Sequence, residues 1–348
     1  MPRVIGIDPG TVSIDVCGLD EGTLFLDRSL PTAQALADPG AFIASFTNAG
    51  GIDLIAGPSG YGLPLVRAAD ATDEDLRLAF LAAPGETGGI AGLHRLATAL
   101  GQCGVPVVYT PGVIHLDTVP SHRKLNRVDM GTADKVAAAA LGIADQAERL
   151  GCSPRETSFL LLELGGAFSA ALAVHGGCVV DGLGGTSGSI GWGSSGALDG
   201  EVAYLAGAIT KEMLFRGGVR SVIAEDPSRR PVALAAFVEG AIRAARGLEA
   251  SVPEPREVLV SGRALEESDV GERLVAALGR IAPVHPLRGF ARLAKPAAQG
   301  AAILADGLSG GRWRDVVDNM RLRAAHGTVL DHLVVISRSA ARRRLGLD

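Results

Sequence analysis

The sequence has few cysteines and no long hydrophobic run. Its four cysteines, Cys17, Cys103, Cys152 and Cys178, are scattered, without a Cys-x-x-Cys pair or histidines at metal-ligand spacing. We therefore expect buried, reduced thiols without a redox role. No run of about 18 uncharged apolar residues occurs, and the N-terminus has a strand pattern, not that of a signal peptide. These absences predict a cytoplasmic protein without a membrane-spanning segment.

A large excess of one charge is also absent. The formal net charge is −5, and 20% of the residues are charged. This balance argues against a nucleic-acid partner, but it leaves open a phosphorylated ligand, which would be bound locally. A length of 348 residues with 47% hydrophobic residues predicts an ordinary globular protein of two lobes.

Glycine, in contrast, is abundant, with 47 residues that gather in clusters. The first cluster joins two strand patterns, which cover residues 3–7 and 13–19 and precede a third at 23–29. The turn between the first two contains Asp8, Gly10 and Thr11. A carboxylate, a backbone open to close approach and a hydroxyl are what a phosphate-binding turn needs, although a plain Pro-Gly hairpin would look similar.

The same strand–turn–strand pattern returns after residue 157, with the turn "LGGAFS" in place of "DPGTVS". This repetition predicts that the chain consists of two related halves, and "GCSPRE" marks the boundary between them. We predict an N-terminal lobe at 1–153, a C-terminal lobe at 154–308 and a C-terminal extension at 309–348. Helices are expected at 131–150, 199–216, 232–248 and 296–308, where small or apolar residues predominate.

A third glycine turn, Gly262-Arg263, follows the strand pattern "EVLVS". Three such turns in this order resemble the superfamily of acetate and sugar kinases, Hsp70 and actin. The resemblance implies an α/β, two-lobed, duplicated ribonuclease-H-like (actin-like ATPase) fold with a mixed sheet in each lobe. It also implies a cleft for ATP and Mg²⁺ between the lobes, and a homodimer.

By this resemblance, Asp8, Gly10 and Thr11 form the first phosphate turn, and Gly165, Gly166 and Ser169 the second. Asp8 or Glu163 would hold the metal, although the superfamily has Asp where this chain has Glu163. Gly262 and Arg263 would lie at the adenosine, and Gly185 and Thr186 near the phosphates.

Charged residues gather in one segment, "HLDTVPSHRKLNRVDMGTADK". Its end resembles the "G-x-D-R" helix start of type III pantothenate kinases, which implies that Asp134 faces the acceptor beside Lys135. Alternatively, Thr132 caps the helix and Asp134 favours the helix dipole. Arg123 and Arg127 would share a face and clamp an anion if this stretch is helical, or would be a solvated surface pair.

Over its full length the chain also resembles a family labelled "predicted butyrate kinase", through "VIGIDPGT", "LIAGPSGYGLPL", "GLGGTSGSIG" and "KPAAQGAA". This resemblance implies phosphoryl transfer from ATP to a short carboxylic acid, a small-molecule acceptor that needs an arginine clamp and no base. A hydroxyl acceptor, which would use Asp134 as base, and an ATPase or regulator without an acceptor stay open.

Overall fold

The computed structural model describes residues 2–10, 12–48, 50–57, 59–81, 83, 89–262, 265 and 268–347, with only the backbone at 89–91 and 268. Thr11 and Arg263, two of the predicted ligand-binding residues, therefore lie outside the described residues. Among those described, no helix combines the length and apolar character needed to cross a bilayer.

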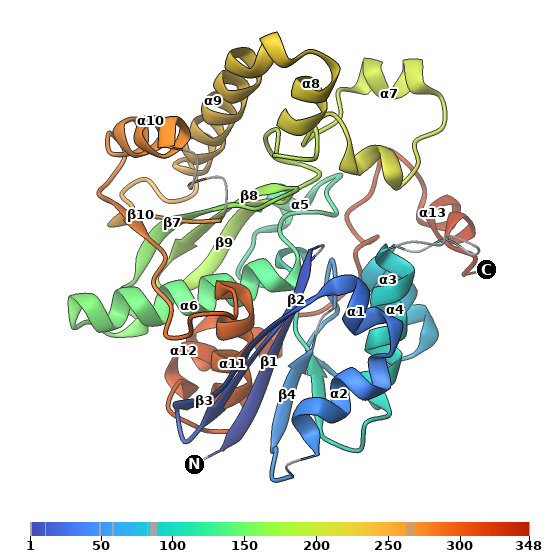
Figure 1. Cartoon of the computed structure of the whole chain (residues 1–348), viewed down its shortest axis with the longest axis vertical. Helices are drawn as coiled ribbons and strands as arrows, with labels where there is room; N and C mark the ends of the chain where they lie inside the picture. The colour runs from blue at the N-terminus through green and yellow to red at the C-terminus, as the bar shows by residue number, and fades with distance from the viewer. Residues whose placement is uncertain are drawn as a thin grey trace.

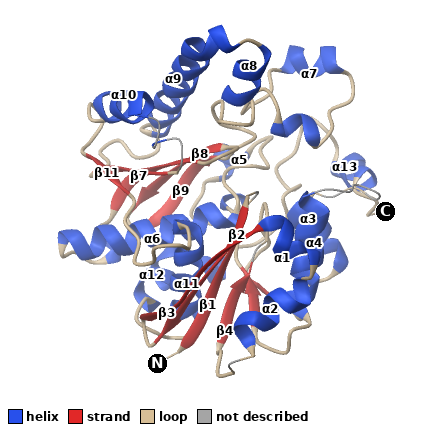
Figure 2. Cartoon of the chain, in the orientation of Figure 1, coloured by secondary structure: helices blue, strands red, loops and turns tan. Residues whose placement is uncertain are grey.

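Two mixed β-sheets form the centre of the molecule (Figure 2). The first has the order β3-β2-β1-β4-β6-β5 and the second β11-β10-β7-β8-β9. Their strands are β1 (Arg3–Pro9), β2 (Ser13–Asp20), β3 (Thr23–Pro31), β4 (Leu54–Gly57), β5 (Val66–Arg67), β6 (Val107–Tyr109), β7 (Ser158–Leu164), β8 (Ser169–His175), β9 (Cys178–Leu183), β10 (Glu257–Ser261) and β11 (Val284–Pro286). In each sheet an antiparallel three-stranded meander continues into parallel strands, which confirms the predicted duplication.

Helices cover the outer face of each sheet (Figure 1). The first sheet is covered by α1 (Thr32–Ala37), α2 (Pro39–Thr47), α3 (Asp73–Phe80) and α4 (Gly89–Gly101). The second is covered by α8 (Val219–Glu225), α9 (Arg230–Leu248) and α10 (Ser268–Leu278). The remaining helices are α5 (Ser121–Lys124), α6 (Ala133–Leu150), α7 (Gly200–Ala206), α11 (Pro296–Leu308), α12 (Arg314–Met320) and α13 (Arg338–Arg344).

Helices α6 and α11 pack against each other between the two sheets. Their small residues allow this close packing: a methyl group on Gly300 of α11 would lie 1.8 Å from the carbonyl oxygen of Ala137. Likewise, a methyl group on Gly6 of β1 would lie 2.1 Å from the backbone nitrogen of Ala302. Helix α11, which we assigned to the C-terminal lobe, therefore packs directly on the N-terminal sheet, and the lobe limits stay a prediction.

One predicted helix is wrong. Residues 199–216 form the short helix α7 and a separate 3₁₀ turn at Glu212–Phe215, not one helix. Helix α7 ends at Gly207, whose φ of 72° is left-handed. Tyr204 and Leu205 are 80% and 81% exposed, so packing does not extend this helix.

Candidate functional site

The two predicted phosphate turns occupy equivalent places in the two sheets. The last pair of the β1–β2 hairpin is Pro9 with Ile14, and that of the β7–β8 hairpin is Leu164 with Ser169. Asp8 and Glu163 each lie one pair before the turn. The two carboxylates that the sequence offers as metal ligands are therefore counterparts of each other in the duplicated fold.

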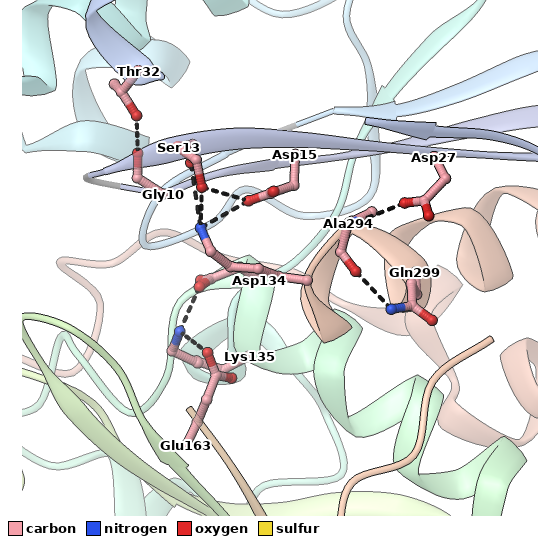
Figure 3. A network of polar contacts seen from close by, with 11 residues as sticks. Gly10, Ser13, Asp15, Asp27, Thr32, Asp134, Lys135, Glu163, Ala294 and Gln299 are labelled. Atoms are coloured by element: carbon pink, nitrogen blue, oxygen red, sulfur yellow. Dashed lines mark hydrogen bonds and ion pairs between the residues drawn. The ribbon is translucent and has the colours of Figure 1, made fainter. Parts of the chain in front are cut away.

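Lys135 joins the two halves at this point (Figure 3). Its Nζ lies 2.6 Å from Asp134 Oδ2, at the start of α6, and 2.8 Å from Glu163 Oε1, at the end of β7. Thr132 makes no side-chain cap of this helix. Its hydroxyl and the backbone N–H of Asp134 both hydrogen-bond to the Asp134 carboxylate instead. The predicted helix-capping role of Thr132 is therefore wrong.

The carboxylates of this cluster differ in charge state. Burial, with a smaller contribution from the negative charge of Asp134, raises the pKa of Asp8 to about 7, although Lys135 and Lys295 oppose the shift. Burial also acts to raise the pKa of Asp134, but Lys135 and the hydrogen bonds outweigh it and hold that pKa below its ordinary value. The pKa of Lys135 is raised well above its ordinary value, because these carboxylates outweigh the effect of burial. Asp134 and Lys135 are thus both charged at neutral pH, whereas Asp8 is poised between its two forms.

Glu163 offers an oxygen to a ligand. Its Oε2 is buried and has no hydrogen-bond partner in the described part of the chain. A buried carboxylate oxygen without a partner is costly, so it marks a place where a cation or a water is expected. No group of three His, Cys, Asp or Glu side chains that could hold a metal ion occurs among the described residues.

Lys295, which the sequence reasoning missed, contacts the first hairpin from the start of α11. Its Nζ lies 2.7 Å from Asp15 Oδ2 and 2.6 Å from Ser13 Oγ, both on β2. Its signal was the lysine of "KPAAQGAA", placed just before a proline that begins a helix. Since 280 residues separate Asp15 and Lys295 in the numbering, no local pattern reveals that they meet.

The loop after β9 is hydrogen-bonded to Asp129, a residue of the charged segment to which the sequence reasoning assigned no role. Its Oδ2 accepts hydrogen bonds from the Thr186 backbone N–H, at 2.9 Å, and hydroxyl, at 2.8 Å. The backbone N–H of Gly184 bonds the Asp129 carbonyl oxygen, and a methyl group on Gly184 would collide with the carboxylate. Thr186 and the adjacent Gly185 are therefore held next to the segment that leads into α6.

The second turn, between β7 and β8, is closed by hydrogen bonds and has open space beside Gly166. The Gly165 N–H donates to the carbonyl of Phe168 at 3.0 Å, and the Ser169 hydroxyl donates to the Ile190 carbonyl at 3.3 Å. A methyl group on Gly166 would meet no atom within 4 Å. Gly262, with φ of 110°, lies against Leu164 at the end of β7, where a methyl group would be 2.1 Å from the Leu164 carbonyl oxygen. The second and third turns are thus neighbours.

The arginine pair is not arranged as we expected. Helix α5 ends at Lys124, and Asn126 has a φ of 54°, so Arg123 and Arg127 do not share a helical face. The Arg123 guanidinium donates to the Val180 carbonyl at 2.7 Å and lies 3.7 Å from Asp181 Oδ2. The helical premise is therefore wrong, and the role of the two arginines in anion binding stays a prediction.

Three acid kinases of known structure share the fold. A propionate kinase from Francisella tularensis subsp. tularensis SCHU S4 is 12% identical with a TM-score of 0.59, covering 86% of this chain and 99% of that chain. An acetate kinase from Porphyromonas gingivalis is 14% identical with a TM-score of 0.57, covering 87% and 98%. An acetate kinase from Entamoeba histolytica is 11% identical with a TM-score of 0.55, covering 80% and 86%.

These likenesses confirm the predicted α/β, two-lobed fold, which this chain shares with the acetate and propionate kinases. No curated protein matches the chain in sequence. A family model does match, from residue 6 to residue 335. Because this match covers nearly the whole chain, the protein belongs to the family described as "Protein of unknown function (DUF1464)".

Proposed function

We propose that this protein is an ATP-dependent small-molecule kinase. The observation that carries the proposal is the meeting of the two duplicated hairpins at one charged cluster, where Lys135 binds Glu163 of β7 and acts electrostatically on Asp8 of β1. Phosphoryl transfer needs positioning and charge neutralisation more than covalent catalysis. Glycine-containing turns beside carboxylates and ammonium groups supply these two requirements.

In this proposal the backbone N–H groups of the two turns bind the phosphates of ATP, with Gly10 on one side and Gly165 and Gly166 on the other. Gly185 and Thr186 would lie near the phosphates and Gly262 at the adenosine. Thr11, Ser169 and Arg263 are assigned to ligand binding by resemblance alone. Close approach of backbone to phosphate is the reason that glycine suits these positions.

The donor set fits Mg²⁺. This ion prefers hard oxygen ligands and commonly takes one or two carboxylates together with water and phosphate oxygens. Asp8 and Glu163 would hold it, and Glu163 Oε2, which has no hydrogen-bond partner among the described residues, provides an oxygen ligand. Four carboxylates in or beside the cluster, Asp8, Asp15, Asp134 and Glu163, face two ammonium groups, Lys135 and Lys295. Bound Mg²⁺ would neutralise part of this negative charge and that of the phosphates.

We propose a short carboxylic acid as the acceptor, as the names of the acetate and propionate kinases suggest for proteins of this fold. An oxygen of the acid would attack the γ-phosphorus, the bond from phosphorus to ADP would break, and an acyl phosphate and ADP would form. A carboxylate is already a nucleophile, so this reaction needs no general base. Arg127, with Arg123, would bind the acid if their side chains turn toward it.

A hydroxyl acceptor is the second candidate, and Asp134 favours it. This carboxylate is ionised beside Lys135, so it can accept a proton from an alcohol while the oxygen attacks phosphorus. The engagement of Arg123 with Val180 and Asp181 also leaves the acid clamp incomplete. The two candidates therefore differ in the residue on which turnover depends.

Phosphorus NMR of the purified protein tests both. Mg²⁺-ATP is incubated with a panel of short carboxylic acids and, separately, with a panel of hydroxylated metabolites. An acyl-phosphate resonance supports the first acceptor, and a phosphate-ester resonance supports the second. Free phosphate alone, lost in Asp8→Asn and kept in Asp318→Asn, would instead indicate an ATPase without an acceptor. Asp318 is a matched control because it is 49% exposed on α12 and pairs only with nearby Arg314 in the described chain. Failure to bind or consume ATP would refute the kinase proposal.

A further inference from the structure

Lys295 is held in place from several sides. The Asp27 carboxylate of β3 accepts hydrogen bonds from the backbone N–H groups of residues 292, 293 and 294, at 2.7–3.1 Å. Gln299 Oε1 accepts from the backbone of Phe290 and Ala291, and its Nε2 donates to the Ala294 carbonyl (Figure 3). The segment before α11 is thus fixed on the first meander, and the Lys295 backbone has little freedom.

The side chain of Lys295 is also anchored. Asp15 is fully buried and Ser13 is 7% exposed, and both bind the Lys295 ammonium within 2.7 Å. The Ser13 hydroxyl in turn donates to Asp15 Oδ2 at 3.0 Å. Lys295 itself is 35% exposed along its side chain. It is therefore an ordered, positively charged side chain that is partly open to solvent.

The ammonium group lies at the first phosphate turn. A methyl group on Gly10 would be 2.9 Å from Lys295 Nζ, so this nitrogen is next to the Gly10 Cα. The Gly10 carbonyl is bound by the Thr32 hydroxyl at 2.7 Å. Two of the three donors of Lys295 are used by Asp15 and Ser13 Oγ. Among the described residues, the third donor has only the Ser13 carbonyl at 3.5 Å, longer than an ordinary hydrogen bond.

We propose that Lys295 binds a phosphate group of the ligand beside Gly10 and Ser13, where β1 leads into β2. The inference rests on the proposed kinase function, because it takes the β1–β2 turn as a phosphate site. It adds a residue that no motif assigned and that comes from the other end of the chain. A purely structural role, in which Lys295 only neutralises buried Asp15, is the competing explanation.

Isothermal titration with Mg²⁺-ATP, Mg²⁺-pyrophosphate and adenosine separates the two explanations. We compare the wild type with Lys295→Met and with the double variant Asp15→Asn/Lys295→Met, in which no unpaired buried carboxylate is left to unfold the protein. A lost charge-assisted hydrogen bond to phosphate weakens binding by about 10- to 100-fold. We expect this loss for ATP and pyrophosphate in either folded variant and no change for adenosine. Arg292→Met, which removes an exposed charge three residues away, should leave all three affinities unchanged.

Unchanged ATP affinity in the Lys295 variants would overturn the proposed role of Lys295. An equal decrease in the affinities for ATP and adenosine would overturn it as well. A wild type that does not bind ATP would refute the kinase proposal. The pyrophosphate affinities of the wild type and the Lys295 variants would then test the role of Lys295. Pyrophosphate binding that is lost with Lys295 would still support the inference. A wild type that binds neither probe would overturn both.

Discussion

Asp134 separates the two acceptor chemistries at the level of one residue. If it is the base for a hydroxyl acceptor, Asp134→Asn should lower kcat by about 10²- to 10⁴-fold, because general-base catalysis contributes that much. If the acceptor is a carboxylic acid, we expect a decrease of less than about tenfold. Steady-state kinetics with the accepted substrate measures the difference. An unchanged kcat with an alcohol would exclude Asp134 as the base, and Asp318→Asn is the control.

Asp8 predicts an unusual dependence of stability on pH. An aspartate in an unfolded chain ionises near its ordinary pKa of 3.8, whereas that of folded Asp8 is about 7. Between these values the folded protein keeps a proton that the unfolded chain has lost, so stability falls as pH rises through this window. The full displacement corresponds to about 4 kcal/mol. Asp8→Asn, always neutral, should escape this loss.

Urea denaturation of both proteins at pH 4.5 and pH 8, without metal or nucleotide, measures this effect. We expect Asp8→Asn to unfold at higher urea than the wild type at pH 8 and to differ little at pH 4.5. Equal midpoints at both values would show that the Asp8 carboxylate is not perturbed. Added stability in a variant that loses activity is typical of a functional carboxylate.

Single residues also show how far sequence reasoning reaches. Asp8, Glu163, Asp134 and Lys135 do meet in one cluster. The duplicated pattern places Asp8 and Glu163 at the ends of corresponding strands, and the predicted helix places Asp134 and Lys135 at its start. The partners of Asp129 and Lys295 were not predicted, since they are distant in the chain. The spacing of Arg123 and Arg127 misled us, because it indicates a shared face only within a helix.

At the scale of elements, α11 packs so closely on α6 and β1 that no side chain fits at Gly300 of α11 or at Gly6 of β1. Gly300→Ala should lower the free energy of unfolding by several kcal/mol, because the new methyl group meets the Ala137 backbone at 1.8 Å and neither helix can move alone. Gly247→Ala is the matched control, since a methyl group in this part of α9 meets no atom within 4 Å. It should stabilise the protein by about 0.5–1 kcal/mol through helix propensity.

Chemical denaturation of the two glycine variants measures these changes. Equal stability of Gly300→Ala and the wild type would mean that α6 and α11 pack less tightly than described.

The limits of α11 and the first three strands followed closely from the sequence, because small-residue and alternating patterns are long and regular there. Residues 199–216 did not, since a run of helix-forming residues without a buried face does not sustain a helix.

At the scale of the whole molecule, Asp27 of β3 holds residues 292–294 against the N-terminal sheet. Burial acts to raise its pKa, but three backbone N–H donors from residues 292–294 outweigh it and hold the pKa below the ordinary value. The stability that Asp27 contributes is therefore present above about pH 4 and lost as the pH falls below it. Asp27→Ala should lower the free energy of unfolding at pH 7 by about 1–3 kcal/mol, because three donors lose their acceptor.

The difference in the free energy of unfolding between Asp27→Ala and the wild type should become smaller when unfolding is measured below pH 4. Asp318→Ala, which breaks an exposed pair on α12, should cost less than about 1 kcal/mol at either pH. A constant difference for Asp27→Ala across this range would indicate that its contribution does not depend on charge.

The position of α11 also determines when the N-terminal sheet is able to fold during synthesis. Strand β1 is made before α11, which covers one of its faces and ends at residue 308. At about 5–20 residues per second, the ribosome needs roughly 15 to 60 s to make the part of the chain between β1 and the end of α11. Until then the inner face of the first sheet has no permanent cover. We therefore expect the nascent chain to expose apolar strands for much of its translation, and such surfaces are what chaperones bind.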